Sequence, residues 1–455
     1  MVPVEPVGGD GVAGTMKILC VTKQFGRSYQ QGTERYIRTL THCLRGRGHE
    51  VAVLGGDPLA LSGRTTLGDV VEDDEDKIHH YPIRGWMAVM GLPARRLATW
   101  IADHGPDLVH VTNPAHVGIG AMAACRRLGI AVVVTTMDFW WVCPKSTLLR
   151  ADGSLCDGTP PWHECIRCAC ESHARARLNF PVRPPRVLAP LAMAPYVVQG
   201  FLRGMSPGDV PRWVRRRTLL SECLDATDHV IFPSRATRDA IGAQLGHDRW
   251  RLVPYGLHET WFERPRTPAS ALIPPEDFRI GFAGALLPHK GPHLLLEAAK
   301  QLGWHRSPIA LAGGFAPGGY ETTLRRAAEG LNVTFEGWIP SPRMPEFLRG
   351  LDVLALPSLW PENLPFSMLE AHAAGVPVVA ADVAGVSDQV TDARLRFEPG
   401  SVEGLAAALE FVRQSPGEIA TPTVHTAGEM TDATLAVYEQ ALAHAAGGRR
   451  GKGDP

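Results

Sequence analysis

At 455 residues the chain is long for one domain, and two domains of about 200 residues each are expected. Hydrophobic residues make up 45%, enough for complete cores, and the formal net charge of −1 argues against nucleic acid as a partner. No apolar run approaches the ~20 residues of a membrane span. Residues 1–15 lack an apolar core, so we expect a disordered leader, not a signal peptide. The expected location is cytoplasmic, where the nine cysteines would be thiols or metal ligands.

The first half of the chain alternates short apolar runs with amphipathic segments, which predicts a parallel, doubly wound α/β sheet. An acidic segment, residues 72–76, is expected to be a solvated turn, and residues 143–223 are expected to be irregular. The expected strands are residues 17–24, 48–56, 76–83, 107–113, 130–136, 229–234 and 251–256, and the expected helices follow Gly32 and span 94–104 and 115–128.

A second alternating series starts at residue 278 and predicts a second Rossmann-like domain. Its expected strands are residues 278–284, 309–314, 332–338, 352–358 and 376–381, with helices at 292–302 and 320–330. The resulting domains are residues 16–263 and 278–425, joined by a Pro/Arg-rich linker, residues 264–277, and followed by a helix within 426–447 and a tail, 448–455.

One stretch, residues 357–380, carries two glutamates eight positions apart, Glu362 and Glu370. An apolar strand precedes it, and Asn363 is placed to cap a helix with Pro365 in its first turn. Parallel sheets bind ligands beyond the carboxyl ends of their strands, and a helix N-terminus suits phosphate. Glu362 would lie at that mouth and Glu370 roughly 9 Å along the helix. The two acids could hold hydroxyls on both sides of a diphosphate, or be solvated acids of an ordinary helix.

The sequence of residues 357–380, PSLWPENLPFSMLEAHAAGVPVVA, resembles the donor-site signature of GT4-type (group 1) retaining glycosyltransferases. The resemblance implies the GT-B architecture, in which two Rossmann-like domains face a cleft and the last helix crosses back to the first domain. It implies that Glu370 binds the ribose and Glu362 the donor sugar. The further donor-binding residues that it implies are Asn363, Leu364, Pro365 and Phe366 near the diphosphate, and Trp338 and Ile339 near the base.

The loop GALLPHKGPHLLLEA, from Gly284, is similar to the family's G-x-L…K-G segment and assigns Gly284, His289 and Lys290 to the donor site. A lysine beside a helix N-terminus is a good counter-ion for a leaving diphosphate, so Lys290 is also a catalytic candidate and no metal cofactor is required. Many relatives carry an arginine where this chain has Ala285, which leaves more of that task to Lys290.

In the first domain, Gly32 corresponds to the family's glycine-rich turn, although Gln31 replaces its first glycine. Met137 stands where many relatives have a histidine beside the reacting sugar, and methionine cannot accept a proton. Either the histidine is dispensable, or another residue substitutes, or the enzyme is inactive. The expected substitutes are Asp138, which could equally cap a turn, His110 and His116.

Five cysteines lie within 28 residues, among Gly, Pro and Asp. Four of them, Cys143, Cys156, Cys165 and Cys168, form C-x12-C-x8-C-x2-C, with Cys170 or His163 as substitute ligands. This pattern predicts a structural zinc ion, and independent buried thiols are the alternative. The Arg- and Pro-rich residues 171–223 could bind the acceptor or a membrane surface, but packing on the first domain is the simpler interpretation.

These observations predict a retaining, metal-independent glycosyltransferase, which moves a glycosyl group from a nucleotide-diphosphate sugar to an acceptor hydroxyl. The acceptor would be a natural product or a cell-surface glycan. Two alternatives stay open: a catalytically impaired nucleotide-sugar-binding protein, motivated by Met137 and Ala285, and a sugar-nucleotide epimerase or phosphorylase on the same fold. No nucleic acid partner and no transmembrane segment are expected, and a peripheral membrane contact is left open.

Overall fold

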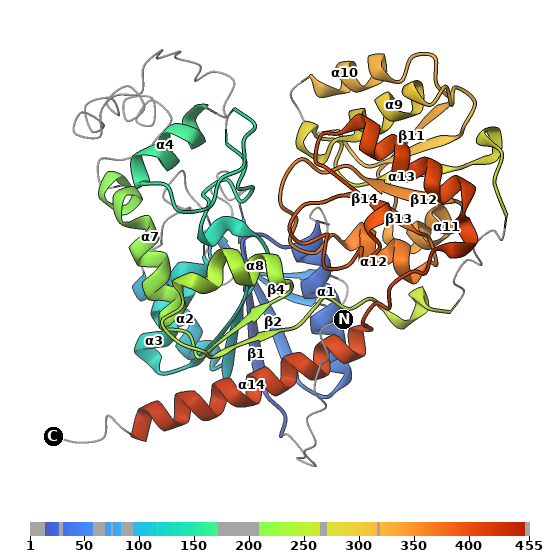
Figure 1. Ribbon diagram of the computed structural model, residues 1–455. Coiled ribbons are helices and arrows are strands. Elements are labelled where there is room, and N and C mark those ends of the chain that lie inside the picture. Colours follow the sequence, from blue (N-terminus) through green and yellow to red (C-terminus); the bar gives the residue numbers. More distant parts are fainter. Residues whose placement is uncertain are drawn as a thin grey trace. The chain divides into compact units, whose positions relative to one another are not determined.

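The computed structural model divides into two compact units (Figure 1). The N-terminal unit comprises residues up to 253 together with residues from 430 onward, and the C-terminal unit comprises residues 254–429. The structure describes residues 14–26, 31–57, 69–73, 76–82, 94–115, 117–150, 152–171, 209–263, 271–315 and 319–450. The expected leader and tail therefore lie almost wholly outside the described residues.

The N-terminal unit is built on a sheet whose described strands follow the order β3-β4-β2-β1-β5-β6-β7-β8. Neighbouring strands are parallel except for β3 and β4, which form an antiparallel pair at one edge. That pair narrows the expected turn at residues 72–76, because β3 ends at Asp73 and β4 begins at Asp76; residues 74–75 lie outside the described residues. The strands are β1 (Lys17–Thr22), β2 (Glu50–Asp57), β3 (Asp69–Asp73), β4 (Asp76–Pro82), β5 (Leu108–Val111), β6 (Ala131–Thr135), β7 (His229–Phe232) and β8 (Trp250–Leu252).

Helices flank this sheet, and two of them lie in the stretch that we expected to be irregular. The helices are α1 (Gly32–Gly46), α2 (Ala94–His104), α3 (Gly118–Leu128), α4 (Trp162–Glu171), α7 (Asp209–Asp225) and α8 (Arg235–Ile241). The expectation for residues 143–223 was wrong at α4 and α7, which pack against each other. Arginines dominate the sequence of α7, but its Leu220 and Leu224 are buried and supply the apolar face that composition concealed.

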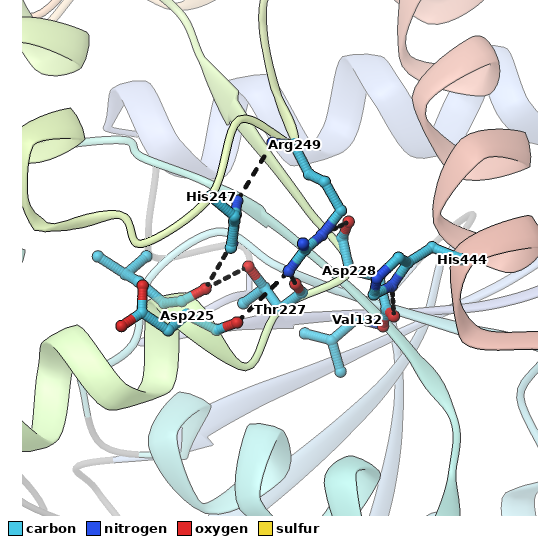
Figure 2. Close-up of polar contacts among 8 residues, drawn as sticks. Val132, Asp225, Thr227, Asp228, His247, Arg249 and His444 are labelled. Carbon is cyan, nitrogen blue, oxygen red and sulfur yellow. Dashed lines mark hydrogen bonds and ion pairs between the residues drawn. The ribbon is translucent and has the colours of Figure 1, made fainter. Parts of the chain in front are cut away.

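The last helix, α14 (Ala427–Arg450), belongs to the N-terminal unit from Met430 onward. Tyr438 is fully buried, and its hydroxyl lies 2.7 Å from Nδ1 of His110. Figure 2 shows a second attachment near the end of the helix, where Nδ1 of His444 lies 2.8 Å from Oδ1 of Asp228. The other carboxylate oxygen of Asp228 accepts a hydrogen bond from the Val132 N–H, and Arg249 donates to its carbonyl oxygen.

The C-terminal unit has a parallel sheet whose described strands follow the order β11-β10-β9-β12-β13-β14. Strand order reverses between β9 and β12: β10 and β11 lie on one side of β9, and β12, β13 and β14 lie on its other side. The strands are β9 (Ile280–Ala283), β10 (Ile309–Ala312), β11 (Val333–Gly337), β12 (Val353–Leu356), β13 (Val378–Ala381) and β14 (Arg396–Phe397). The helices are α9 (Pro292–Gln301), α10 (Tyr320–Ala327), α11 (Met344–Arg349), α12 (Phe366–Ala373) and α13 (Val402–Gln414).

Residues 254–263, which we expected in the first domain, contact the C-terminal unit instead. The Leu257 N–H donates to the His425 carbonyl at 2.9 Å, and the Ala427 N–H donates back to the Leu257 carbonyl at 2.7 Å. At the other end of the expected linker, Arg413 binds the carbonyl of Ile273 at 2.7 Å. Among the described residues, no helix is both long and apolar enough to cross a membrane.

Candidate functional site

The loops that follow β9 and β12 touch each other at the reversal point of the C-terminal sheet. The Leu359 N–H donates to the His289 carbonyl at 2.8 Å. Gly291 has φ +70°, and a Cβ atom there would lie 2.0 Å from the Pro357 carbonyl oxygen. Only glycine permits this approach. Ligands of doubly wound sheets bind at such reversal points, so this is where a site is expected.

Glu362 and Lys290 form an ion pair across these two loops. Glu362 is 7% exposed, and its Oε1 atom accepts hydrogen bonds from Lys290 Nζ at 2.6 Å, Ser358 Oγ at 2.7 Å and Trp360 Nε1 at 2.8 Å. Charge-assisted bonds of this length are strong, and together they offset the desolvation of a buried carboxylate. The structure thus brings together two residues that are 72 positions apart in the sequence.

The Trp360 ring lies beside the same ammonium group. Lys290 Nζ is 4.8 Å from the ring centroid, within the range of a cation–π interaction. The His289 ring meets the Trp360 ring edge-on at 4.8 Å. Neither Trp360 nor Ser358 was singled out from the sequence, although both lie inside the signature stretch; their contacts depend on the approach of the β9 loop.

A third loop, which follows β13, contacts the backbone of Glu362. The Glu362 N–H donates to the Ala384 carbonyl at 2.9 Å. Gly385 has φ +86°, and a Cβ atom there would lie 1.9 Å from the Glu362 carbonyl oxygen. The backbone that carries the carboxylate is therefore fixed on two sides.

Helix α12 begins later than we expected, at Phe366, and Asn363 is not its N-cap. Pro365 occupies the cap position with ψ 122°, and a proline disfavours helical conformation in the residue before it. Asn363 instead donates from Nδ2 to the Tyr255 hydroxyl at 2.9 Å. The Tyr255 ring stacks on Phe366, with centroids 4.9 Å apart. Tyr255, which sequence reasoning missed, thus positions two of the predicted donor-site residues.

Glu370 lies four residues after the start of α12 and is 1% exposed. Its distance along the axis is therefore roughly 6 Å from the first helical residue, shorter than the expected 9 Å. A carboxylate so deeply enclosed needs polar partners, and Glu370 does interact with other residues of the chain.

The remaining predicted donor residues lie at neighbouring strand ends. The Gly284 N–H donates to the Ala312 carbonyl at 2.9 Å, and the Gly313 N–H donates to the Gly337 carbonyl at 2.7 Å, which ties the ends of β9, β10 and β11 together. Trp338 follows β11 and is 53% exposed, while Ile339 is half-buried. An exposed indole at the carboxyl edge of a sheet offers an apolar face for a flat ligand.

In the N-terminal unit, Asp138 acts as a cap. Its Oδ1 atom accepts from the Trp140 N–H at 2.8 Å and its Oδ2 atom from Asn113 Nδ2 at 3.3 Å. Burial raises the pKa of Asp138, and the Trp140 N–H opposes that shift. These contacts fit the capping role that was one of the two interpretations of this residue.

His110 does not substitute for the missing histidine. It is fully buried, with Nδ1 2.7 Å from the Tyr438 hydroxyl and Nε2 2.7 Å from the Thr135 hydroxyl. Burial lowers its pKa to about 3. Met137 is also buried, and His116 lies outside the described residues.

Gly32 is the exposed first residue of α1, and the buried carboxylate of this turn belongs to Glu34. Burial raises the pKa of Glu34, although hydrogen bonds from backbone N–H groups and from Gln24 oppose that shift. Sequence reasoning did not select Glu34, although it lies two residues after Gly32 in the segment QGTER, residues 31–35.

The four predicted zinc ligands line one cavity of about 270 Å³ in the N-terminal unit. All four are free thiols, and Lys145 Nζ lies 3.6 Å from Cys168 Sγ. Burial, with smaller contributions from the nearby Cys143, Cys156 and Cys168, raises the pKa of Cys165 to about 11. Within the described part of the chain, however, no three His, Cys, Asp or Glu side chains are arranged to hold a metal ion. Zinc therefore stays a prediction.

Comparison with known proteins agrees with this geometry. The family model "Glycosyl transferases group 1" matches residues 263–422, and "Glycosyltransferase Family 4" matches residues 31–151. The D-inositol 3-phosphate glycosyltransferase of Acidothermus cellulolyticus is 34% identical over 208 residues, which cover 41% of this chain and 46% of that protein. Its namesake from Mycobacteroides abscessus is 32% identical over 258 residues, 52% of this chain and 58% of that protein. The chain thus spans about half the length of the curated relatives it matches.

Solved structures resemble the whole fold. Anabaena HepE in complex with UDP has a TM-score of 0.57 at 15% identity, over 96% of this chain and 99% of that one. Sucrose-phosphate synthase from Thermosynechococcus elongatus has a TM-score of 0.57 at 16% identity, over 95% and 98% of the two chains. The two family models together match more than half of the sequence, one in each unit. The chain belongs to the group 1, or GT4, glycosyltransferase family and has the two-domain GT-B fold.

Proposed function

We propose that this transferase uses a nucleotide-diphosphate sugar and transfers its glycosyl group, with retention of configuration, to an acceptor hydroxyl. The observation that carries the proposal is the Lys290–Glu362 pair at the reversal point between β9 and β12. A cation for the diphosphate and a carboxylate for sugar hydroxyls lie 2.6 Å apart there. The structural neighbour HepE is described in complex with UDP and with UDP-glucose, which supports a uridine nucleotide as the first donor to test.

Each donor residue then has a role set by its chemistry. Lys290 and the first N–H groups of α12 would neutralise the diphosphate. The second carboxylate oxygen of Glu362 would accept hydrogen bonds from sugar hydroxyls, and Glu370 would accept them from the ribose. Trp338 and Ile339 would pack against the base.

In the reaction the bond between the anomeric carbon and the phosphate oxygen breaks, and the acceptor oxygen bonds to the same face of that carbon. The acceptor proton passes to the leaving phosphate oxygen, so no protein base is needed. This scheme is compatible with Met137 and with the capping contacts of Asp138. Because a lysine and helix N–H groups stabilise the leaving group, the scheme also needs no metal ion.

We further propose that the protein works in the cytoplasm. Cysteines of the described segments are free thiols, as expected in a reducing compartment. The acceptor we propose is a natural product or a cell-surface glycan, and the names of the relatives make an inositol phosphate a useful first test acceptor.

A catalytically impaired nucleotide-sugar-binding protein is the second candidate, because buried Met137 occupies the place of the family histidine. One experiment separates the two. UDP-, GDP- and ADP-sugars are first screened by thermal shift, where a ligand at about 100 times its Kd adds about 2.7 kcal/mol of stability. The stabilising donor is then incubated with acceptors, with and without EDTA.

Acceptor-dependent release of the nucleoside diphosphate, unchanged by EDTA, and a product with the donor's anomeric configuration are expected. Tight donor binding without turnover across the acceptor panel would favour the impaired protein. Release without any acceptor, or an altered sugar still attached to nucleotide, would point to hydrolysis or to an epimerase.

A further inference from the structure

We propose that Trp360 is a positioning residue that keeps Glu362 in place while Lys290 moves from Glu362 to the donor diphosphate. This inference rests on the proposed function, since it concerns how the same site changes when a donor binds. It begins from one fact: Trp360 contacts both members of the ion pair, through its indole N–H and through its ring face.

One oxygen of Glu362 accepts three hydrogen bonds in the structure. Lys290, Ser358 and Trp360 donate to Oε1, at 2.6, 2.7 and 2.8 Å. This arrangement fixes the carboxylate rotamer and leaves Oε2 as the oxygen that can receive sugar hydroxyls. Pro361 lies between Trp360 and Glu362, and its ring fixes φ at that position, so the backbone between the indole and the carboxylate has little freedom.

A bound diphosphate would compete with Glu362 for the single ammonium group of Lys290. When Lys290 turns toward phosphate, Glu362 loses its nearest cation and could follow it out of position. Ser358 and Trp360 remain as two donors to Oε1, so the buried carboxylate stays hydrogen-bonded. The Trp360 ring, 4.8 Å from Nζ, still faces the ammonium group as it moves.

The alternative is that Trp360 only fills space between the loops. Its position argues against this, because Trp360 is only half-buried, whereas Trp304, a tryptophan that packs in the core of the same unit, is 6% exposed. A space-filling role predicts a loss of stability on truncation. A positioning role predicts a loss of turnover that depends on Glu362.

The test uses Trp360→Phe, which keeps a ring but removes the N–H, and Trp360→Leu, which removes both. Trp304→Phe is the matched control, since Trp304 is a buried tryptophan of the same unit that packs edge-on against Phe278. Each variant is assayed for kcat and KM with the donor, and for affinity toward the nucleoside diphosphate and monophosphate. Trp360→Phe is then combined with Glu362→Gln in a double-mutant cycle.

We expect Trp360→Phe to lower kcat about tenfold, as the loss of one hydrogen bond to a charged group would, with diphosphate affinity unchanged. Trp360→Leu should in addition weaken binding of the diphosphate but not of the monophosphate, because only the former uses Lys290. In the Glu362→Gln background the effect of Trp360→Phe should fall to within about twofold. Trp304→Phe should leave kcat and diphosphate affinity unchanged.

Equal kcat for Trp360→Phe and the parent enzyme, or full additivity with Glu362→Gln, would overturn the inference while the proposed function stands. A parent protein that neither binds nucleoside diphosphates nor transfers sugar would overturn both.

Discussion

Two groups of polar side chains, one in each unit, differ in how their charges are balanced. In the C-terminal unit, Lys290 and Glu362 carry opposite charges and stand 2.6 Å apart. In the N-terminal unit, four thiols line one cavity together with cationic side chains, among them Lys145, whose Nζ lies 3.6 Å from Cys168 Sγ. Opposite charges draw each other into a short contact without help. Ionised thiols repel one another, so only a cation could draw them into a tetrahedron.

The supporting backbones differ as well. Glycines with positive φ, Gly291 and Gly385, let the donor loops pack closely at the ends of parallel strands. In the cysteine loop, Ser146 and Leu148 adopt positive φ values of 62° and 50° without being glycine. Such conformations cost about 1–3 kcal/mol each and persist only where surrounding structure enforces them. The side chains around Glu362 are therefore held by contacts within the chain, and for residues 143–170 we predict that a bound metal ion adds to the order of the segment.

The largest expected effect follows from breaking the ion pair. Lys290→Ala removes the cation that we propose for the leaving diphosphate, and it leaves Glu362 as a buried charge without its counter-ion. We expect kcat to fall about 10²–10³-fold, as it does when one preorganised electrostatic group is removed. The measurement is steady-state turnover with the best donor. Lys300→Ala is the control, because Lys300 is exposed in the last turn of the adjacent helix α9; equal losses in both variants would refute the assignment.

A smaller effect is expected at Glu370. Glu370→Ala should weaken nucleotide binding by about 1.5–3 kcal/mol, the range for hydrogen bonds to a charged group. Glu362→Gln should spare free-nucleotide binding and reduce turnover, since Glu362 is assigned to the sugar. Isothermal titration with UDP and UDP-glucose measures both. Exposed Glu297 of α9 offers the control variant Glu297→Ala. Parent-like UDP affinity in Glu370→Ala would remove Glu370 from the ribose site.

His110 and Tyr438 form a third arrangement, in which two buried polar side chains form a hydrogen bond to each other. Tyr438→Phe leaves the buried Nδ1 of His110 without its 2.7 Å partner, which should lower the free energy of unfolding by about 1–3 kcal/mol. Asp432→Asn on the same helix breaks the exposed pair with Arg47 and should cost less than about 1 kcal/mol. Denaturant unfolding compares the two variants. Equal losses would mean that the buried bond contributes no more than a surface ion pair.

The same histidine predicts the direction of the pH dependence. Its pKa is lowered to about 3 in the folded protein from 6.5. The unfolded chain therefore binds a proton first, and the contribution of His110 is lost as pH falls from 6.5 toward 3. The slope attributable to His110 is at most about 1.4 kcal/mol per pH unit. A His110→Phe variant should show a shallower decline in this range.

The sequence predicted most strands of the two sheets, because buried parallel strands are short apolar runs that can be recognised without knowing their tertiary contacts. Helix α2 was predicted at its observed bounds, Ala94–His104. Helices α4 and α7 were missed: the cysteines of α4 suggested a metal-binding loop, and the arginines of α7 outweighed its buried leucines. Strand β14, of two residues, carries no periodic signal of its own.

At the site, sequence supplied the residues but not their contacts. Glu362 and Lys290 were both predicted, yet their pairing depends on two loops that meet only in the folded sheet. The contact of Tyr255 with Asn363 and that of Trp360 with Lys290 are long-range contacts of the same kind. Asn363 was misplaced as a cap because its side chain has a more distant partner, the Tyr255 hydroxyl.

Changes in the cysteine cavity should have no effect on nucleotide binding by the C-terminal unit. We predict about one zinc per chain by elemental analysis, bound by Cys143, Cys156, Cys165 and Cys168. Four protein ligands close the coordination sphere, so the ion would be structural. Chelation should expose the loop to limited proteolysis, because metal affinity is realised as folding free energy, while UDP affinity stays unchanged.

Variants separate a metal site from independent thiols. Cys165→Ser with Cys168→Ser should abolish zinc binding and make the loop cleavable. Cys223→Ser should do neither, because Cys223 lies on α7 and does not line the cavity. The side chains must rotate to reach coordination, since no three of them stand in that arrangement in the described residues. The prediction is wrong if the parent protein contains no zinc and its loop resists protease as well as the zinc-supplemented sample does. These cysteines would then contribute only to packing, and the Lys290–Glu362 pair would be the one of the two groups that forms without an added ion.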